Sequence, residues 1–117
     1  MQQDQLLGSP CTWTEIDSQV NATATATHPA NVGWTHYIGG ISISCSGQPT
    51  SSVQVLIKAG AVVLDQWEIP SAAFGPIIPP FFRPYRGAQG GTVSVTIGAM
   101  GAGVRGTVSI RGFSGAP

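Results

Sequence analysis

The sequence predicts an all-β protein, a single β-sandwich or jelly-roll domain of about eight short antiparallel strands. The first observation is a two-residue alternation of apolar and small polar side chains, clearest over 41–45, 53–57 and 93–97. Successive side chains of a strand point to opposite faces, so each run has one apolar and one polar face. The second observation is the 16 glycines and 9 prolines among 117 residues, which interrupt the chain too often for long helices.

The elements follow in chain order from this alternation and from the turn residues between the runs. The first ten residues are polar and unpatterned, so we expect an extended N-terminal arm over 1–10 and the β-sandwich domain over 11–117. Strands are expected over 11–16, 20–27, 34–46, 52–59, 61–69, 81–86, 91–99 and 103–113.

Three glycine-containing segments predict how the strands are joined or bent. Ala59-Gly60 predicts a tight hairpin between the fourth and fifth strands, and residues 99–102 predict a second hairpin near the C-terminus. Gly39-Gly40 inside the third strand predicts a bulge or bend, where a sheet curves or another backbone approaches closely.

Residues 70–84 break the alternation, because they combine five prolines with three phenylalanines and two isoleucines. Each proline removes a ladder donor, which excludes this segment from a central strand. The large apolar side chains still require burial. The segment either folds back over the sandwich or packs against a neighbouring subunit, and the sequence leaves both open.

The chain carries few charges: 9% of its residues are Asp, Glu, Lys or Arg, and the formal net charge is zero. In ordinary soluble domains, charged residues make up about 25% of the chain. Capture of nucleic acid or anionic lipid needs clustered Lys and Arg, so we expect neither nucleic acid nor a membrane as partner. A weakly charged surface favours association, so we expect the chain to pack against other subunits.

Two cysteines, Cys11 and Cys45, could pair or remain reduced. The chain opens without the basic start and apolar stretch of a signal peptide, and no run of eighteen apolar residues is present. We therefore expect synthesis in the cytoplasm and reduced thiols.

The motifs that resemble catalytic or cofactor sites have simpler interpretations. Residues 101–106 fit the dinucleotide pattern G-x-G-x-x-G, but a strand follows where the motif needs a helix, so a hairpin turn is favoured. His28 and His36, eight residues apart, lack a convincing ligand set or nucleophile beside them and are expected to be structural. We therefore expect no catalytic residue, no cofactor and no metal site.

Aromatic and cationic residues are the candidates for contacts with other molecules. Trp13, Trp34 and Trp67 could stack on sugar rings, although core or subunit contacts are favoured. Four of the five cations are arginines of the C-terminal third, where they could mark an interface or only solvate the surface. They are Arg83, Arg86, Arg105 and Arg111, with Asp65 and Glu68 as candidate partners across a boundary.

The order of short motifs resembles that of small virion proteins of tailed bacteriophages, over roughly residues 20–113. Residues 34–44 (Trp-Thr-His-Tyr-Ile-Gly-Gly-Ile-Ser-Ile-Ser) contain a His-Tyr dipeptide that opens a core strand. Residues 82–87 (Phe-Arg-Pro-Tyr-Arg-Gly) place an Arg-Gly step after an aromatic loop, and residues 112–113 close the chain on Gly-Phe. Head and tail members of this group are not separated by these motifs.

The resemblance implies a capsid decoration (cement) protein. Such proteins are small β-sandwiches or jelly rolls that add to the outside of the head, commonly as homotrimers, and clamp neighbouring major capsid subunits. The expected partners are thus the major capsid protein and further copies of this chain, and the expected location is the outer capsid surface of the virion. A tail or fibre subunit that contacts the host is one alternative, and a glycan-binding β-sandwich module is another. An enzyme is not expected.

Two sets of residues are the expected contact sites under this hypothesis. The subunit-interface candidates are Trp67, Pro76, Ile77, Ile78, Phe81, Phe82, Arg83, Tyr85 and Arg86. The capsid-contact candidates are Leu6, Leu7 and Trp13.

Overall fold

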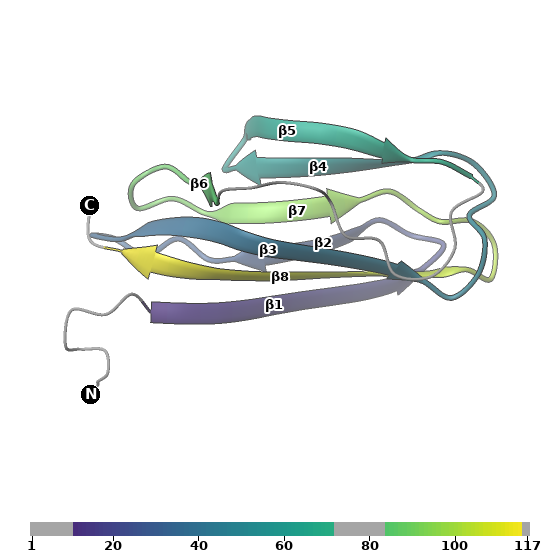
Figure 1. Cartoon of the computed structure of the whole chain (residues 1–117), viewed down its shortest axis with the longest axis horizontal. Helices are drawn as coiled ribbons and strands as arrows, with labels where there is room; N and C mark the ends of the chain where they lie inside the picture. The colour runs from purple at the N-terminus through teal and green to yellow at the C-terminus, as the bar shows by residue number, and fades with distance from the viewer. Residues whose placement is uncertain (1–10, 72–83, 116–117) are drawn as a thin grey trace.

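A computed structural model of the chain describes residues 11–71 and 84–115, which form β-strands joined by turns and loops (Figure 1). The strands are β1 (Cys11–Val20), β2 (Ala24–His28), β3 (Thr35–Cys45), β4 (Val53–Ala59), β5 (Val62–Ile69), β6 (Tyr85–Arg86), β7 (Val93–Ile97) and β8 (Arg105–Gly115). The all-β expectation is confirmed. The expected arm over 1–10 lies outside the described residues. The described part contains no helix that is long and apolar enough to cross a membrane.

The strands form two four-stranded antiparallel sheets that pack as a sandwich (Figure 1). Sheet A has the order β1-β8-β3-β6, and sheet B has the order β2-β7-β4-β5. Ladders pair β1 with β8, β2 with β7, β3 with β6 and β4 with β5. The first strand thus pairs with the last, the second with the seventh, and so on inward. This is one long antiparallel ribbon rolled on itself, the jelly-roll arrangement that the sequence predicts.

The alternation in the sequence becomes the division between core and surface. In β4, Val53, Val55, Ile57 and Ala59 are buried, and the residues between them lie nearer the surface. The inward side chains of both sheets form one aliphatic core cluster. Each fully buried Val or Ile contributes about 1.5–3 kcal/mol relative to an exposed one, so this cluster is what holds the two sheets together.

Two of the predicted turns and bends are confirmed. Ala59 pairs with Val62, which leaves a two-residue hairpin whose Gly60 has φ +60°. In β3, the register against β8 shifts between Ile38 and Gly40, so Gly39 is the extra residue of a bulge. The glycine pair is therefore the point at which β3 leaves regular pleating.

The predicted hairpin over residues 99–102 is wrong. Its flanking strands, β7 and β8, belong to different sheets, so this segment crosses from sheet B to sheet A. The turn itself is tight, because the Val104 N–H donates to the Gly101 carbonyl at 3.0 Å. Met100, 1% exposed, lies between the sheets near Gly106, where an added Cβ would lie 2.8 Å from the Met100 Cγ. Alternation shows which residues face inward but not which sheet they belong to.

The two cysteines are too far apart to form a disulfide with each other. In the ladders with β8, Cys11 lies opposite Ser114 and Cys45 lies opposite Gly106. Eight residues of β8 separate those positions, about 26 Å along a strand, whereas a disulfide needs Cα atoms within about 7 Å.

Candidate interaction surface

The outer face of sheet A consists of the side chains of its strands that point away from the core. Their alternation with buried residues and the β1–β8–β3 register define this face. It contains Thr12, Thr14, Ile16, Ser18 and Val20 of β1; Arg105, Thr107, Ser109, Arg111 and Phe113 of β8; Tyr37, Gly40, Ser42 and Ser44 of β3; and Arg86 of β6.

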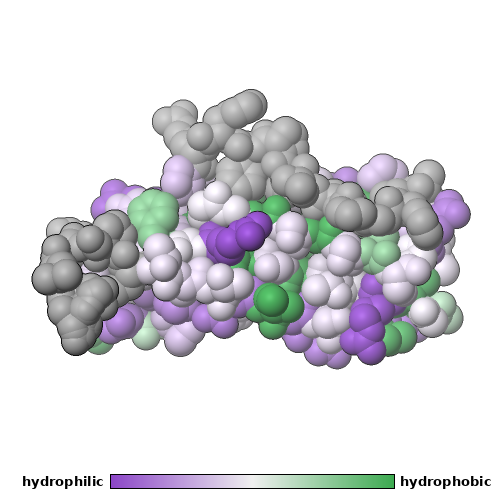
Figure 2. All heavy atoms as spheres, turned by 60° about the horizontal axis from the view of Figure 1, so that its bottom comes forward, coloured by the Kyte–Doolittle hydropathy of each residue, from purple (hydrophilic) through white to green (hydrophobic). Residues whose placement is uncertain are grey.

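Small hydroxyl side chains dominate this face, and Ile16 (65% exposed) and Val20 (47% exposed) are its aliphatic members. The Ser18 and Thr107 hydroxyls lie 2.9 Å apart across the β1–β8 ladder, and Arg105 Nη1 donates to Ser18 Oγ at 3.0 Å. Seen from the side on which β1 lies, the molecule is mostly of intermediate hydropathy, with scattered hydrophilic and hydrophobic side chains (Figure 2). Ser and Thr hydroxyls are therefore the commonest groups on this face, with a few aliphatic side chains and three arginines among them.

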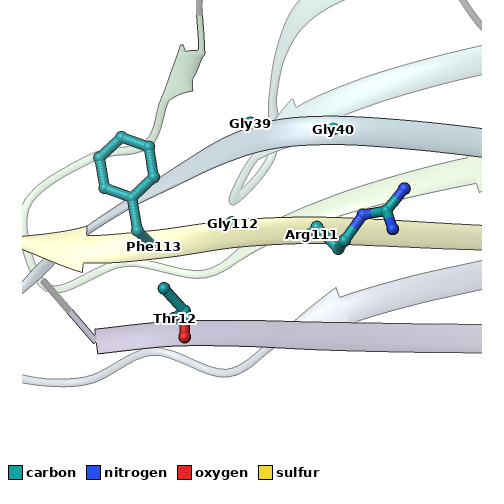
Figure 3. Close-up of a pocket in the computed structure, with 6 residues that line it drawn as sticks. All are labelled: Thr12, Gly39, Gly40, Arg111, Gly112 and Phe113. Atoms are coloured by element: carbon teal, nitrogen blue, oxygen red, sulfur yellow. The ribbon is translucent and has the colours of Figure 1, made fainter.

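A shallow hollow of about 240 Å³ lies at the β3 bulge. Its lining residues are Thr12, Gly39, Gly40, Arg111, Gly112 and Phe113 (Figure 3). The hollow exists because Gly39 and Gly40 place no side chains beside β8. Figure 3 shows the Arg111 and Phe113 side chains directed away from each other on either side of the Gly112 backbone.

The walls of the hollow are held by neighbouring contacts. The Phe113 ring stacks on the Tyr37 ring at 4.9 Å between centroids and an interplanar angle of 11°. A Cβ added at Gly112 would overlap the Tyr37 carbonyl oxygen and the Trp13 indole, so only glycine fits there. The hollow is thus a preformed feature of the sheet.

The edge strands β1 and β2 belong to opposite sheets, and side chains close the β1/β2 seam between them. Glu15 Oε2 lies 2.8 Å from His28 Nδ1, and the Trp13 indole stacks on the His28 ring at 4.2 Å. The Thr25 N–H donates to Asp17 Oδ2 at 2.8 Å. This bond is the main reason that the pKa of Asp17 lies below its usual value.

His36 is buried behind the same seam. Its Nε2 lies 3.0 Å from the Pro29 carbonyl, which only accepts, so Nε2 carries a proton. In the neutral ring, Nδ1 then accepts from the Ser114 hydroxyl at 2.5 Å, and Trp13 Nε1 donates to the same hydroxyl oxygen at 3.1 Å. Burial, and secondarily the nearby His28 ring at 4.4 Å, lower the pKa of His36. Both histidines therefore have structural contacts, as the sequence predicts.

A hydrogen bond joins a second pair of edge strands, β5 and β6, at what we call the β5/β6 seam. The Tyr85 hydroxyl donates to Asp65 Oδ2 at 2.6 Å. Burial and then this bond raise the pKa of Tyr85 to about 12. The Asp65 carboxylate, a candidate partner for an arginine of another subunit, is thus engaged within its own chain.

The comparisons with known proteins concern the fold. No family model matches the chain, and no curated protein matches it. A chain of the acidic stable capsid structure of Helicobacter pylori bacteriophage KHP30 is similar at 15% identity and a TM-score of 0.47, over 86% of this chain and 93% of that chain. The insecticidal delta-endotoxin Cry8Ea1 of Bacillus thuringiensis is similar at 9% identity and a TM-score of 0.48, over 89% of this chain and 19% of that one.

A carbohydrate-binding module, CBM36 in complex with calcium and xylotriose, is similar at 14% identity and a TM-score of 0.39. The likeness covers 82% of this chain and 77% of that chain. At these identities and TM-scores the three likenesses assign no function to this chain. Among the described residues, no group of three or more His, Cys, Asp or Glu side chains is placed to hold a metal ion.

The predicted contact residues do not form one site in the structure. Trp13 on β1, Trp67 on β5 and Tyr85 on β6 are half-buried and pack against the core cluster. Arg86 is exposed on the outer face of sheet A. The remaining candidates lie outside the described residues: Leu6, Leu7, Pro76, Ile77, Ile78, Phe81, Phe82 and Arg83. Their roles stay predictions.

Sequence reasoning did not identify the outer face of sheet A as a unit. A signal was present in β8, where Arg105, Arg111 and Phe113 alternate with glycine or aliphatic residues and so share one face. The hollow had a weaker signal, the Gly39-Gly40 pair, because a bulge alone does not show what stands opposite it. The two seams had no local signal, since their bonds join residues far apart in the chain.

Proposed function

We propose that this chain is a structural virion protein that decorates the outside of a phage capsid and stabilises it by bridging major capsid subunits. The short motifs shared with small tailed-phage virion proteins support this class, and the jelly-roll fold agrees with it. The observation that carries the proposal is the outer face of sheet A, an extended face on which Ser, Thr and Gly residues surround three arginines.

Such a face suits contact with a large, preformed protein surface. Short Ser, Thr and Gly side chains let a partner approach the sheet closely and lose little conformational entropy on binding. The charged side chains of this face are three arginines, and a partner surface has to pair them, because an unpaired buried charge would be the most costly element of such an interface. The exposed Ile16 and Val20 side chains add apolar area to be buried.

The proposal includes contacts between copies of the decoration protein. We propose a homotrimer, in which the proline- and phenylalanine-rich segment supplies subunit contacts. A trimer binds the shell through three subunits, and each subunit that is bound raises the effective concentration of the other two at their sites. Modest affinities of single subunits then add up to strong binding of the trimer.

Purified heads of the phage that encodes the chain provide the test. We expect mass spectrometry to find a copy number that matches the capsid lattice. Heads that lack the chain should release their DNA at a lower temperature, and adding back the purified protein should restore the original temperature. A few copies per particle would instead indicate a tail or fibre subunit and would contradict the proposal.

The purified protein also distinguishes the decoration role from the alternative of a glycan-binding module. A glycan-binding module would be retained on a sugar column, and Trp34→Ala or Trp67→Ala would abolish retention without unfolding the protein. Retention of this kind, combined with no effect on heads, would replace the decoration role by the glycan-binding one.

A further inference from the structure

We infer that the outer face of sheet A is the side that meets the shell, and that Arg111 at the hollow receives a carboxylate side chain of an acidic capsid surface. This inference rests on the proposed function and specifies which face of the sandwich binds and what chemistry its partner presents.

The first step is the distribution of positive charge. All arginines of the described residues project from this one face: Arg86, Arg105 and Arg111. Lys58, the remaining described cation, lies on the outer face of sheet B, between the buried Ile57 and Ala59. A chain with zero formal net charge thus presents three cations on one face.

The second step is the placement of the carboxylates, which lie elsewhere in the described structure. Glu15 and Asp17 occupy the β1/β2 seam, and Asp65 binds Tyr85 at the β5/β6 seam. Glu68 pairs with Gln54 on the outer face of sheet B. The three arginines are therefore not neutralised on their own face, and an acidic partner surface is the complementary one.

The third step is Arg111 itself. A Cβ added at Gly40 would lie 3.7 Å from Arg111 Nε, so the guanidinium stem passes beside the side-chain-free floor of the hollow. Arg111 is exposed, and no carboxylate of the described residues forms an ion pair with it. A guanidinium binds a carboxylate through two parallel N–H···O bonds, so an exposed Arg111 without an ion pair is suited to receive an Asp or Glu side chain of the partner.

The size of the hollow and its surroundings favour a protein side chain over a larger ligand. At about 240 Å³ it is smaller than common small-molecule pockets, which have about 300–1,000 Å³. Ile16 and Val20 on the same face are exposed aliphatic side chains, which a protein surface covers and a hydrated sugar chain does not.

Binding of purified variants to heads stripped of the protein tests the inference. Arg111→Glu should weaken binding by roughly 10- to 100-fold, because it removes a charge-assisted pair and adds repulsion. Lys58→Glu makes the same change in charge on the outer face of sheet B and should bind like the unmodified protein. The binding of the unmodified protein should weaken as salt increases, and Arg111→Ala should reduce that dependence.

A second pair of variants tests the hollow without changing any charge. Gly40→Leu places a side chain in the hollow, and a Cβ at Gly40 makes only ordinary van der Waals contacts, at 3.7 Å to Arg111 Nε and 3.9 Å to Arg111 Cβ. Gly47→Leu, in the loop after β3, meets nothing within 4 Å and serves as its control. We expect Gly40→Leu to reduce head binding by about tenfold, Gly47→Leu to leave it unchanged, and both variants to unfold at similar denaturant concentrations.

The outcomes separate this inference from the proposed function. If the unmodified protein binds heads, and Arg111→Glu and Gly40→Leu bind equally well, the inferred contact face is wrong. The proposed decoration role is then unaffected. If the unmodified protein does not bind heads, the proposed function fails, and the inference fails with it. If Arg111→Glu abolishes retention on polygalacturonate while heads are ignored, the face binds an acidic glycan and the inference is overturned.

Discussion

His36 is held in one protonation state by its hydrogen bonds. With Nε2–H donated to the Pro29 carbonyl, the neutral ring uses Nδ1 to accept the Ser114 hydroxyl proton. A protonated ring would donate from both nitrogens and leave the buried Ser114 hydroxyl without that acceptor. Burial opposes the charged ring as well, and the neighbouring His28 adds to the effect in its protonated form.

This arrangement predicts a loss of stability on mild acidification. Because the pKa of His36 is lowered from its ordinary 6.5 in the folded protein, the unfolded chain takes up a proton that the folded chain resists. The stability that the protein gains from a neutral His36 is complete above pH 6.5. It declines as the pH falls below that value toward the lowered pKa of His36. We expect urea midpoints to decrease over this window, with Glu15 and His28 as the titratable neighbours across the seam.

The matched variant is His36→Gln, whose amide retains one donor and one acceptor. It should unfold at a lower urea concentration at neutral pH, and its midpoint should depend less on pH below 6.5. An unchanged pH dependence in His36→Gln would assign the effect to another group. Asp17 does not interfere, since its lowered pKa confines its loss of stabilisation to pH values below 3.8.

At the scale of elements, the strands and their facing were predictable, and their partners were not. The alternation at Val53, Val55 and Ile57 is a local signal, because period two follows from strand geometry alone. The Gly39-Gly40 bulge and the Gly60 hairpin were also local, as glycine marks positions where the backbone departs from regular pleating.

The connection over 99–102 shows where local signals end. A tight glycine turn is compatible with a hairpin and with a crossing between sheets, and the burial of Met100 between the sheets distinguishes the two. The candidate site also has a part that the local sequence indicates and a part that it does not. The alternation in β8 indicates a shared face for Arg105 and Arg111, whereas the hollow depends on the register of β3 against β8.

The β5/β6 seam leads to a prediction at this scale. Tyr85→Phe removes the hydrogen bond to Asp65 and should lower the free energy of unfolding by about 0.5–1.5 kcal/mol, measured by urea denaturation. In Asp65→Asn, ultraviolet absorbance titration should show the pKa of Tyr85 moving from about 12 only part of the way toward 10.0, because burial is the larger cause. A full return to 10.0 would contradict the burial of this hydroxyl.

For the whole molecule, the rolled ribbon separates strand partners widely along the chain. Among the described strands, only the β4–β5 ladder joins consecutive strands, and the β1–β8 ladder joins Cys11 to Ser114. Long loops must close before the other ladders form, so we expect folding in milliseconds to seconds, as in other all-β domains.

The one consecutive hairpin should then form early. Gly60→Ala strains a backbone position at φ +60°, and most of its destabilisation should appear as slower folding in stopped-flow experiments. Gly112→Ala disturbs packing between β1, β3 and β8, and its destabilisation of about 1–3 kcal/mol should appear mainly as faster unfolding. If Gly112→Ala instead slowed folding and Gly60→Ala sped up unfolding, the folding nucleus would lie in sheet A.

The β1–β8 ladder places Cys11 beside Ser114 at one pole of the sandwich. A short peptide linker could therefore join residue 11 to residue 115, and the chain could be reopened at the Gly60-Ala61 hairpin as a circular permutant with the same sheets. A peptide fused directly to residue 11 or to residue 115 would leave from that same pole. Two different cargoes could thus be displayed next to each other on every copy.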